Sequence, residues 1–457
     1  MDAAVTDSAG TPADPDPGPT PSPGASPEPG PDAGPGREPE PGPDRPDEDG
    51  AGSRDGAGDG AGGPDGGGGP GTWARRSRAG RPVGRKRHWA RWTALGAALV
   101  VLVAAGAGWW LYRKLNGNIR TDTAAEAELR AYERERPTAL VTDAQNILLI
   151  GSDSRAGDNR KYGRDDGGRQ RSDTVILLHL AADRKSATAM SVPRDLMVEI
   201  PGCHGSGGKA TGATTAQFNW AFEIGGTACT VRTVELMTKI RVDHHMVVDF
   251  SGFKDMVDAV DGVRICVREP IDDPAAHLRL AAGQHTLDGE QALGYVRARK
   301  SLGDGSDTER MDRQQQFLAA LVNKVQSNGV LLNPARLYPV LDAATKSLTT
   351  DTGLDSLRDL YGLVRGMRNV PTDKVQFLTV PRRPYRQNAN RDELVQPDAD
   401  QLFGQLREDA PVTVVPAKNS GSGAAPGERA DATTGTAGAT PNPTYSGTNA
   451  ADDLCKG

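Results

Sequence analysis

NILLIGSD, residues 146–153, and DTVILLHL, residues 173–180, are two short apolar runs, each with an aspartate at one end. Runs of this length that are rich in isoleucine, leucine and valine predict buried β-strands over 146–151 and 173–180. A polar, glycine-rich stretch through residue 170 separates them, and a third apolar run follows at 187–192. We therefore expect these runs to form a central β-sheet.

Helical spacing of apolar residues predicts helices at 216–240, 250–260, 291–297 and 309–325. A short strand is expected at 263–267, and residues 330–410 are expected to add further helices and one strand, 375–380. The apolar residues of 216–240 and 250–260 suit an ordinary core or the wall of a lipid-binding pocket. The order of elements predicts a mixed α/β fold in which helices cover the central sheet.

The 20 residues 93–112, TALGAALVVLVAAGAGWWLY, contain no charge and are long enough to cross a bilayer as a helix. A buried soluble helix seldom runs this long without a charge. A cleaved signal peptide is disfavoured because the segment lies far from the N-terminus and ends in Trp109, Trp110 and Tyr112, which suit the membrane interface. We therefore expect a cell-membrane protein with a single span.

Basic residues are denser before this segment than after it. Those before it are Arg75, Arg76, Arg78, Arg81, Arg85, Lys86, Arg87 and Arg91, and those close after it are Arg113, Lys114 and Arg120. The positive-inside rule then predicts a cytoplasmic N-terminus and an extracellular remainder.

Composition divides the rest of the chain. Residues 1–72 consist mostly of Pro, Gly, Ala and Asp and hold 15 acidic residues against three arginines. Such a segment buries too little apolar surface to fold, so we predict a disordered cytoplasmic tail. The predicted order is then a basic juxtamembrane segment (73–92), the membrane helix (93–112), an extracellular stalk (113–145), the main domain (146–410) and a disordered C-terminal tail (411–457).

The four cysteines, Cys203, Cys229, Cys266 and Cys455, agree with an extracellular domain, where thiols tend to pair. Four cysteines allow three pairings. A bridge between Cys203 and Cys229 would close a Gly/Ser/Thr-rich loop and leave Cys266 with Cys455. A zinc site is the alternative, but no CxxC spacing supports it.

Asp153 and Asp173 mark the ends of the first two predicted strands. If these strands are antiparallel neighbours, the two carboxylates meet at one edge of the sheet. Two carboxylates without a nearby His or Cys favour Mg²⁺, or Mn²⁺, over zinc. The alternative is that each aspartate caps a loop beside Arg155 or Arg171.

Residues 295–314, YVRARKSLGDGSDTERMDRQ, form a dense arginine cluster in the predicted extracellular part. Its arginines are Arg297, Arg299, Arg310 and Arg313, and Arg194 stands at another predicted strand end. Guanidinium groups at this density favour an anionic ligand, since each can bind a phosphate or carboxylate through two hydrogen bonds. The alternative is a solvated helix face paired with Asp307 and Asp312.

Seven motifs in this order resemble the LytR-CpsA-Psr family. They are GSDSR (151–155), RSDTVILL (171–178), SVPRDLMVEIP (191–201), FNWAFEIGG (218–226), DFSGFKDMVDAVDGV (249–263), LDGEQALGYVRAR (287–299) and DTERMDRQQ (307–315). The resemblance covers residues 146–325 and extends to about 410. Members of the family are membrane-anchored enzymes of Gram-positive cell walls.

The resemblance implies a transferase that moves a glycopolymer from a polyprenyl-pyrophosphate carrier to peptidoglycan and forms a phosphodiester bond. It implies that Asp153 and Asp173 hold Mg²⁺ and that Arg194, Arg299 and Arg310 bind the pyrophosphate. The other implied site residues are Arg155, Arg171, Arg297, Arg313, Gln314 and Asn219, with the apolar helices around the prenyl tail. Asp195 and Asp307 are both candidates for accepting the proton of the attacking hydroxyl.

The chain departs from the family at Gln217 and Phe218, where members often have a lysine just before the asparagine of the FNWAF motif. Two other functions fit the same residues: a non-catalytic binder of lipid-linked polymer that regulates the envelope, and a hydrolase of polyprenyl pyrophosphates. Nucleic acid is disfavoured as a partner because the arginine cluster is predicted to lie outside the cell.

Overall fold

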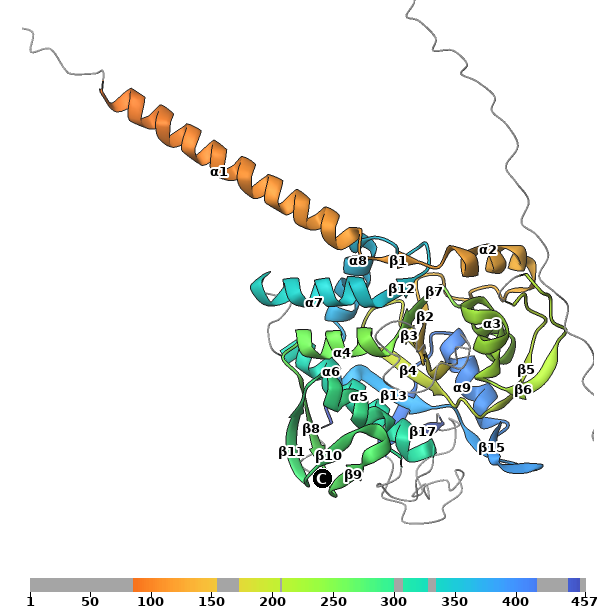
Figure 1. Ribbon diagram of the computed structural model, residues 1–457. Coiled ribbons are helices and arrows are strands. Elements are labelled where there is room, and N and C mark those ends of the chain that lie inside the picture. Colours follow the sequence, from red (N-terminus) through yellow and green to blue (C-terminus); the bar gives the residue numbers. More distant parts are fainter. Residues whose placement is uncertain are drawn as a thin grey trace, which may run out of the picture. The chain divides into compact units, whose positions relative to one another are not determined.

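The computed structural model describes residues 85–153, 172–205, 208–299, 307–327, 334–416 and 443–452. All of them belong to one compact unit, Pro82–Gly457. A nine-stranded mixed sheet runs through this unit in the order β1-β12-β7-β2-β3-β4-β13-β17-β16 (Figure 1). Its strands are β1 (Arg120–Thr121), β2 (Gln145–Ser152), β3 (Ser172–Leu180), β4 (Ala187–Val192), β7 (His244–Val248), β12 (Leu348–Thr350), β13 (Val375–Thr379), β16 (Thr413–Pro416) and β17 (Thr444–Asn449).

Two-stranded sheets accompany the large sheet. They pair β5 (Met197–Ile200) with β6 (Thr214–Gln217), β8 (Val263–Val267) with β11 (Gly283–Leu287), β9 (Ile271–Asp273) with β10 (Leu278–Leu280), and β14 (Arg382–Tyr385) with β15 (Asn388–Leu394).

Helices cover both faces of the large sheet, and the alternation of side chains along β2 shows why. Leu148 and Ile150 enter one apolar cluster, which also takes residues from α2 (Thr123–Ala131), α3 (Trp220–Thr238) and α9 (Asp398–Arg407). Ile147 enters a second cluster with α6 (Asp307–Ser327) and α8 (Leu357–Arg368). Successive strand residues face opposite sides, so an unbroken apolar run supplies both layers. The predicted mixed α/β fold, with helices over a central sheet, is confirmed.

A third apolar cluster lies beside the sheet and joins α4 (Phe250–Ala259), α5 (Gly289–Arg297), the strands β8 to β11 and Phe317 of α6. One further helix, α7 (Pro334–Ser347), packs on α4. The strands predicted at 146–151, 173–180, 187–192 and 263–267, and the helices predicted at 250–260, 291–297 and 309–325, are confirmed to within two residues at each end. The predicted lipid-binding pocket stays a prediction.

The helix expected over 216–240 starts later and is kinked. Ala216 and Gln217 belong to β6, which pairs with β5, and the helix α3 begins at Trp220. Gly225 and Gly226 interrupt it with non-helical backbone angles, and Gly226 has a φ of 60°. Apolar spacing did not reveal this break because buried apolar residues occur on both sides of it, with Phe222 before and Ala228 after.

The kink lies against the predicted disulfide, Cys203–Cys229, which is confirmed with a Cα–Cα distance of 5.7 Å. A Cβ atom added at Gly225 would lie 2.8 Å from the Cβ of Cys229 and 2.9 Å from that of Cys203. Only glycine therefore fits beside the bridge. Cys455, the expected partner of Cys266, lies outside the described residues.

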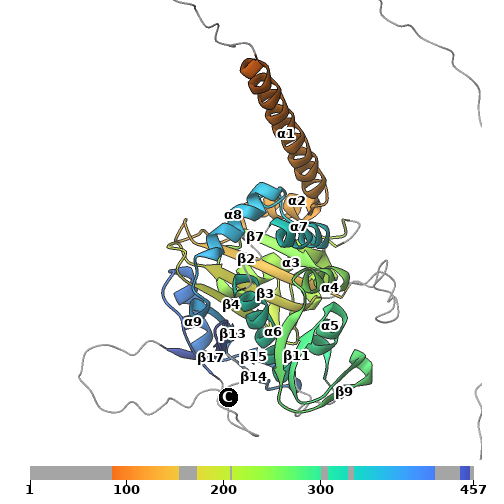
Figure 2. The ribbon, with the colours of Figure 1, turned by 90° about the vertical axis from the view of Figure 1, so that its left-hand side faces the viewer.

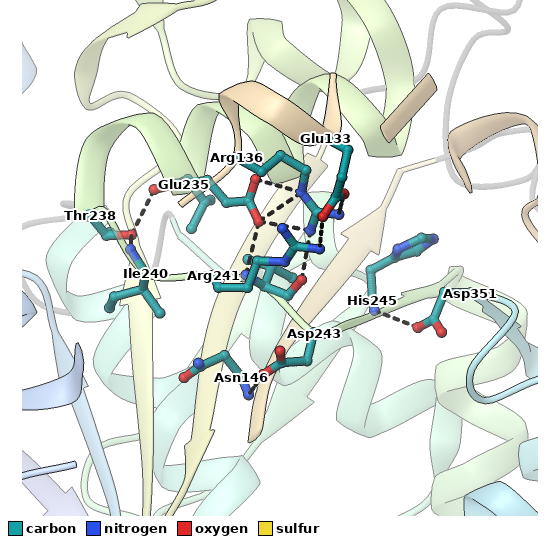
Figure 3. Close-up of polar contacts among 12 residues, drawn as sticks. Glu133, Arg136, Asn146, Glu235, Thr238, Ile240, Arg241, Asp243, His245 and Asp351 are labelled. Carbon is teal, nitrogen blue, oxygen red and sulfur yellow. Dashed lines mark hydrogen bonds and ion pairs between the residues drawn. The ribbon is translucent and has the colours of Figure 1, made fainter. Parts of the chain in front are cut away.

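Residues 113–145, expected to form a stalk, are part of the domain. They contribute β1, α2 and a 3₁₀ turn, Glu133–Glu135. Arg136, just after the turn, donates to both carboxylate oxygens of Glu235 on α3, at 2.8 and 2.9 Å, and Glu235 is 2% exposed (Figure 3). Residues 113–145 were expected to be an exposed stalk, but one of their charged residues, Arg136, forms this buried ion pair with α3.

The C-terminal part holds more strands than expected. Residues 330–410 contain β12, β14 and β15 besides the expected strand β13. Residues 413–416 and 444–449, assigned to a disordered tail, form β16 and β17, which pair with each other in parallel. These strands are short or polar, and their partners are distant in the sequence, so their local pattern is weak.

The apolar segment 93–112 lies within one long helix, α1 (Arg85–Asn116). Among the described residues, His88–Asn116 is the one helical stretch long and apolar enough to cross a membrane.

Candidate active site

The site lies at one edge of the large sheet. The strand β3 is antiparallel to both β2 and β4, while β2 is parallel to β7 and β4 is parallel to β13. The C-terminal ends of β2 and β4 and the N-terminal end of β3 therefore meet at the same edge. The two strands are thus antiparallel neighbours, which is the arrangement required for the carboxylates of Asp153 and Asp173 to lie at one edge of the sheet.

A pocket of about 370 Å³ opens at this edge. Its lining residues are Asp153, Asp173, Arg194, Asp195, Gln217, Asn219, Trp220 and Arg391. Five of these were predicted site residues, namely Asp153, Asp173, Arg194, Asp195 and Asn219. The lining is polar and charged, which suits an ionic ligand.

Arg194 connects the carboxylates of the pocket. Its Nη1 lies 3.0 Å from Oδ1 of Asp173, and its Nε lies 3.3 Å from Oδ2 of Asp195. Its backbone is fixed as well, because its carbonyl oxygen accepts a hydrogen bond of 3.1 Å from the amide of Asn219. Arg194 and the start of α3 are thus held at fixed positions relative to each other.

Asp195 receives donors from three elements of the fold. Besides Arg194, its Oδ1 accepts a hydrogen bond from Nε2 of Gln217 and one of 3.4 Å from Nη1 of Arg391. Gln217 thus supplies an uncharged donor to the pocket. Arg391 brings a positive charge to the same pocket from another part of the chain.

The hairpin of β14 and β15 positions Arg391. The amide of Asp392 donates to the carbonyl of Asp195 at 3.1 Å, and its carboxylate accepts from Nη1 of Arg382 at 2.7 Å. Arg382 also donates to the hydroxyl of Thr308 in the first turn of α6. The hairpin therefore links the pocket to the start of α6.

The oxygen atoms of the pocket suit a hard divalent cation. Asp153 and Asp173 supply carboxylates, and the side chain of Asn219 adds an amide oxygen. Asn219 is 7% exposed, and its Oδ1 has no hydrogen-bond partner in the described part of the chain. A buried carbonyl oxygen normally has a partner, and Mg²⁺ prefers such oxygen ligands. No group of three or more His, Cys, Asp or Glu that could hold a metal occurs among the described residues, so the amide oxygen matters to the fit.

The other predicted arginines gather where α5 ends and α6 begins. The guanidinium of Arg297 lies over the ring of Phe250, 4.7 Å from its centroid, and the backbone amide of Arg299 donates to Asp273 at 2.7 Å. Arg310 is 4% exposed. Arg297, Arg299 and Arg310 do not line the pocket described above.

Arg313 and Gln314 hold the chain around this junction. Arg313, 8% exposed, donates to the carbonyl oxygen of Ala298, and Gln314 donates to that of Val296 at 3.3 Å. Burial lowers the pKa of Arg313, although neighbouring acidic groups act in the opposite direction. The contact of Arg313 with Ala298 fixes the chain next to Arg297 and Arg299.

The junction and the pocket share the same sheet edge. Nε2 of Gln315 on α6 lies 3.2 Å from Oγ of Ser191 and 2.8 Å from Oγ1 of Thr379, near the C-terminal ends of β4 and β13. Ser191 is three residues before Arg194. Of the remaining predicted site residues, Arg155, Arg171 and the side chain of Asp307 lie outside the described residues.

Gln217, Trp220 and Arg391 were not predicted as site residues. Arg391 had a usable signal, since RRPYRQNANR (382–391) holds four arginines in ten residues, twice the density of 295–314, which holds four in twenty. Gln217 and Trp220 were both placed in the helix expected over 216–240, with Trp220 among its apolar residues.

Residues 115–408 match the LytR_cpsA_psr family. The protein belongs to this family. The match begins at the end of α1 and includes the whole pocket, Arg391 among its residues. The resemblance seen in the seven motifs is therefore confirmed, and the match extends beyond residues 146–325 at both ends.

Two family relatives come from Corynebacterium glutamicum. The probable cell wall biosynthesis protein LcpB is 38% identical over 251 residues, 53% of this chain and 57% of that protein. The cell wall biosynthesis protein LcpA is 33% identical over 263 residues, 52% of this chain and 50% of that protein. The chain thus spans about half the length of these relatives.

A third relative is the polyisoprenyl-teichoic acid–peptidoglycan teichoic acid transferase TagT of Bacillus subtilis. It is 29% identical over 302 residues, 63% of this chain and 85% of that protein.

Proposed function

We propose that this protein is a membrane-anchored, extracellular phosphotransferase that moves a glycopolymer from a polyprenyl-pyrophosphate carrier to peptidoglycan. The observation that carries the proposal is the pocket that brings Asp153 and Asp173 together with Arg194 and Arg391. Phosphoryl transfer depends mainly on positioning and on neutralising charge, and this set of residues supplies both. The names of the family relatives, one of them a teichoic acid transferase, support the same chemistry.

In the proposed reaction a hydroxyl oxygen of peptidoglycan attacks the phosphorus that carries the glycan. A new P–O bond forms, the bond to the bridging oxygen of the pyrophosphate breaks, and polyprenyl phosphate leaves with that electron pair. The hydroxyl proton passes to a carboxylate. The products are a glycan joined to peptidoglycan through a phosphodiester and a polyprenyl phosphate.

The arginines and Asp195 have different proposed parts in this reaction. Arg194 and Arg391 bind the pyrophosphate oxygens, and Arg299 and Arg310, at the same sheet edge, bind the remainder of the diphosphate. Asp195 orients Arg194 and Arg391 through its two oxygens. With three donors already on it, Asp195 is better suited to positioning these groups than to accepting a proton.

We further propose that Asp153, Asp173 and Asn219 hold a Mg²⁺ ion. Such an ion supplies positive charge to the phosphate oxygens and so stabilises the negative charge that they carry during transfer. Arg194, which contacts Asp173, keeps the carboxylate in place beside that site.

The location follows from α1. With the basic residues before the span in the cytoplasm, the family domain lies outside the cell. The disulfide Cys203–Cys229 supports this location, because such bonds persist in oxidising compartments.

The test uses the full chain in lipid nanodiscs with Mg²⁺, a polyprenyl-pyrophosphate-linked glycan labelled in the sugar, and peptidoglycan oligomers. Wild type should attach label to peptidoglycan and release polyprenyl phosphate in equal amounts. Asp153→Ala and Arg194→Ala should lose both, whereas Arg279→Ala, at an exposed ion pair with Asp272, should keep both.

Two results would replace the proposal with another function. Release of polyprenyl phosphate with free phosphorylated glycan identifies a hydrolase. Binding of the labelled lipid with neither release nor transfer identifies a non-catalytic binder. Transfer by Asp153→Ala and Arg194→Ala at the rate of wild type would show that the pocket is not the active site.

A further inference from the structure

The outer face of α8 is basic. Arg358, Tyr361, Arg365 and Arg368 follow one another at intervals of three, four and three residues, so they lie on one side of the helix. All four are exposed, and Tyr361 is 59% exposed. The acidic residue of this helix, Asp359, is hydrogen-bonded to Ser356 at the N-cap. The exposed stripe therefore presents positive charge around a single aromatic ring.

The opposite face of α8 is fixed to the domain. Leu360 is 8% exposed, and Leu363 and Met367 pack beside it in the apolar cluster under the sheet. The orientation of the basic stripe is thereby set by the core.

The same apolar cluster also contains a residue that lies shortly after the membrane helix in the sequence. Ile119, three residues after α1, packs in it, and Leu115 in the last turn of α1 is only 3% exposed. The side-chain oxygen of Asn116, the last residue of α1, accepts a hydrogen bond of 3.0 Å from the amide of Leu357, the first residue of α8. In both Figure 1 and Figure 2, α8 lies at the domain end of α1.

The connection between span and domain is too short to separate them. The candidate span runs to Asn116, and β1 begins at Arg120, where it pairs with β12. A second contact reinforces the first, because Nζ of Lys114 lies 3.1 Å from the hydroxyl of Tyr338 on α7. If α1 crosses the bilayer, α8 must therefore lie at the level of the lipid headgroups.

We propose that α8 lies on the outer surface of the bilayer that α1 crosses. Arg358, Arg365 and Arg368 bind the phosphates of anionic phospholipids, and Tyr361 enters the boundary between headgroups and acyl chains. Arginines near an anionic leaflet are attracted to it, and tyrosine is enriched at this depth. The partner is a lipid surface because the membrane helix brings that surface to α8. The inference rests on the membrane anchoring of the proposed function, and it is independent of the chemistry in the pocket.

This contact would also set the orientation of the pocket. The helix α8 packs near Leu180, since a Cβ atom built at Gly366 would lie 3.7 Å from Cδ2 of that leucine. Leu180 pairs with Ala187, where β3 ends and β4 begins, whereas the pocket lies where β3 begins and β4 ends. With α8 on the membrane, the pocket opens at the sheet edge away from the bilayer, on the side where peptidoglycan lies.

The experiment uses the full chain in nanodiscs of phosphatidylcholine, with or without phosphatidylglycerol, and a photoreactive p-benzoylphenylalanine at position 361. A matched chain carries the same group in place of Tyr385, on the hairpin beside the pocket. We expect lipid adducts at position 361 at least tenfold more often than at position 385. The yield at 361 should fall at least fivefold without phosphatidylglycerol and in the triple variant R358Q/R365Q/R368Q, but not in R279Q.

Equal adduct yields at 361 and 385, or a triple variant that crosslinks like the parent chain, would overturn the proposal. Extraction with alkaline carbonate separates the possible causes of failure. A chain that stays in the membrane but gives no adduct at 361 overturns the α8 contact alone. A chain that carbonate removes from the membrane overturns the anchoring and this contact together, while glycan transfer can still be measured in both cases.

Discussion

The guanidinium of Arg194 lies 3.0 Å from a carboxylate oxygen of Asp173, across the edge where β4 ends and β3 begins. The contact is partly open to solvent, since the two side chains are 22% and 37% exposed. An ion pair in such a position remains accessible to a ligand. This exposure is consistent with our proposal that Asp173 binds a cation and Arg194 an anion.

The first prediction concerns Mg²⁺. In Asp173→Asn one of the two carboxylates becomes an amide, so the Mg²⁺ concentration for half-maximal transfer should rise by roughly ten- to a hundredfold. Asp272→Asn, at an exposed ion pair with Arg279, is the control and should leave that concentration unchanged. The measurement is the transfer rate over a series of Mg²⁺ concentrations. If the concentration for half-maximal transfer is unchanged in Asp173→Asn, Asp173 does not bind Mg²⁺.

The second prediction concerns Arg391 and its neighbour Gln217. Both donate to Asp195 in the pocket, and we propose that Arg391 binds the pyrophosphate. Arg391→Ala should lower kcat/KM for the lipid-linked glycan by about ten- to a hundredfold, the effect of losing one charge-assisted hydrogen bond. A lysine at the second position returns a positive charge to the pocket, so Gln217→Lys in the Arg391→Ala chain should recover at least part of the loss.

Arg386→Ala is the matched control for Arg391, because this arginine lies on the same hairpin region with a side chain that is 77% exposed. It should retain the wild-type kcat/KM. If Arg391→Ala behaves like Arg386→Ala, or if Gln217→Lys worsens the defect, the hairpin does not supply a ligand of the substrate.

Local sequence pattern was sufficient for the strands that position Asp153 and Asp173. Each strand is an apolar run, and the two follow one another in the sequence, so their antiparallel pairing is what chain order favours. The start of α3 was placed incorrectly because Ala216 and Gln217 pair with β5 before the helix begins.

The contact of Arg391 with Asp195 could not be predicted from local sequence pattern. Arg391 reaches Asp195 across 196 positions of sequence through the short bridge between Leu196 and Asp392. No local pattern encodes that contact, since it depends on the tertiary position of a polar hairpin. The strands β16 and β17 were missed for the same reason, because β17 is recruited to the sheet by pairing with the distant β13.

The third prediction concerns the ion pair of Arg136 and Glu235 (Figure 3). Glu235 also accepts a hydrogen bond of 3.0 Å from the amide of Val242. Its removal takes this acceptor from the amide and the bidentate carboxylate from the buried Arg136, which keeps contacts to the carbonyl oxygen of Val242 and to Glu133. Glu235→Ala should lower the free energy of unfolding by about 3–5 kcal/mol. Urea unfolding of the full chain in detergent measures the change.

The exposed pair of Arg130 and Glu126 on α2 provides the comparison for Glu235, since the arginine side chain is 71% exposed. Glu126→Ala should cost less than about 1 kcal/mol. Similar losses in the two variants would mean that the buried pair does not anchor the segment before β2 to α3.

The last prediction concerns pH and the pair of His244 and Asp351, whose Nδ1 and Oδ1 atoms are 3.1 Å apart. Burial acts against the charged imidazole, but the hydrogen bond and charge of Asp351 outweigh it and raise the pKa of His244 above 6.5. The contribution of a group with a raised folded-state pKa is complete below its unfolded value and is lost as the pH rises through the folded value. His244→Asn should therefore reduce the free energy of unfolding more at a pH of roughly 5.5 than at roughly 9. Adding Asp351→Asn to both chains removes the partner and should abolish that difference. If His244→Asn lowers the free energy of unfolding equally at both pH values, the imidazole of His244 is not charged in the folded protein.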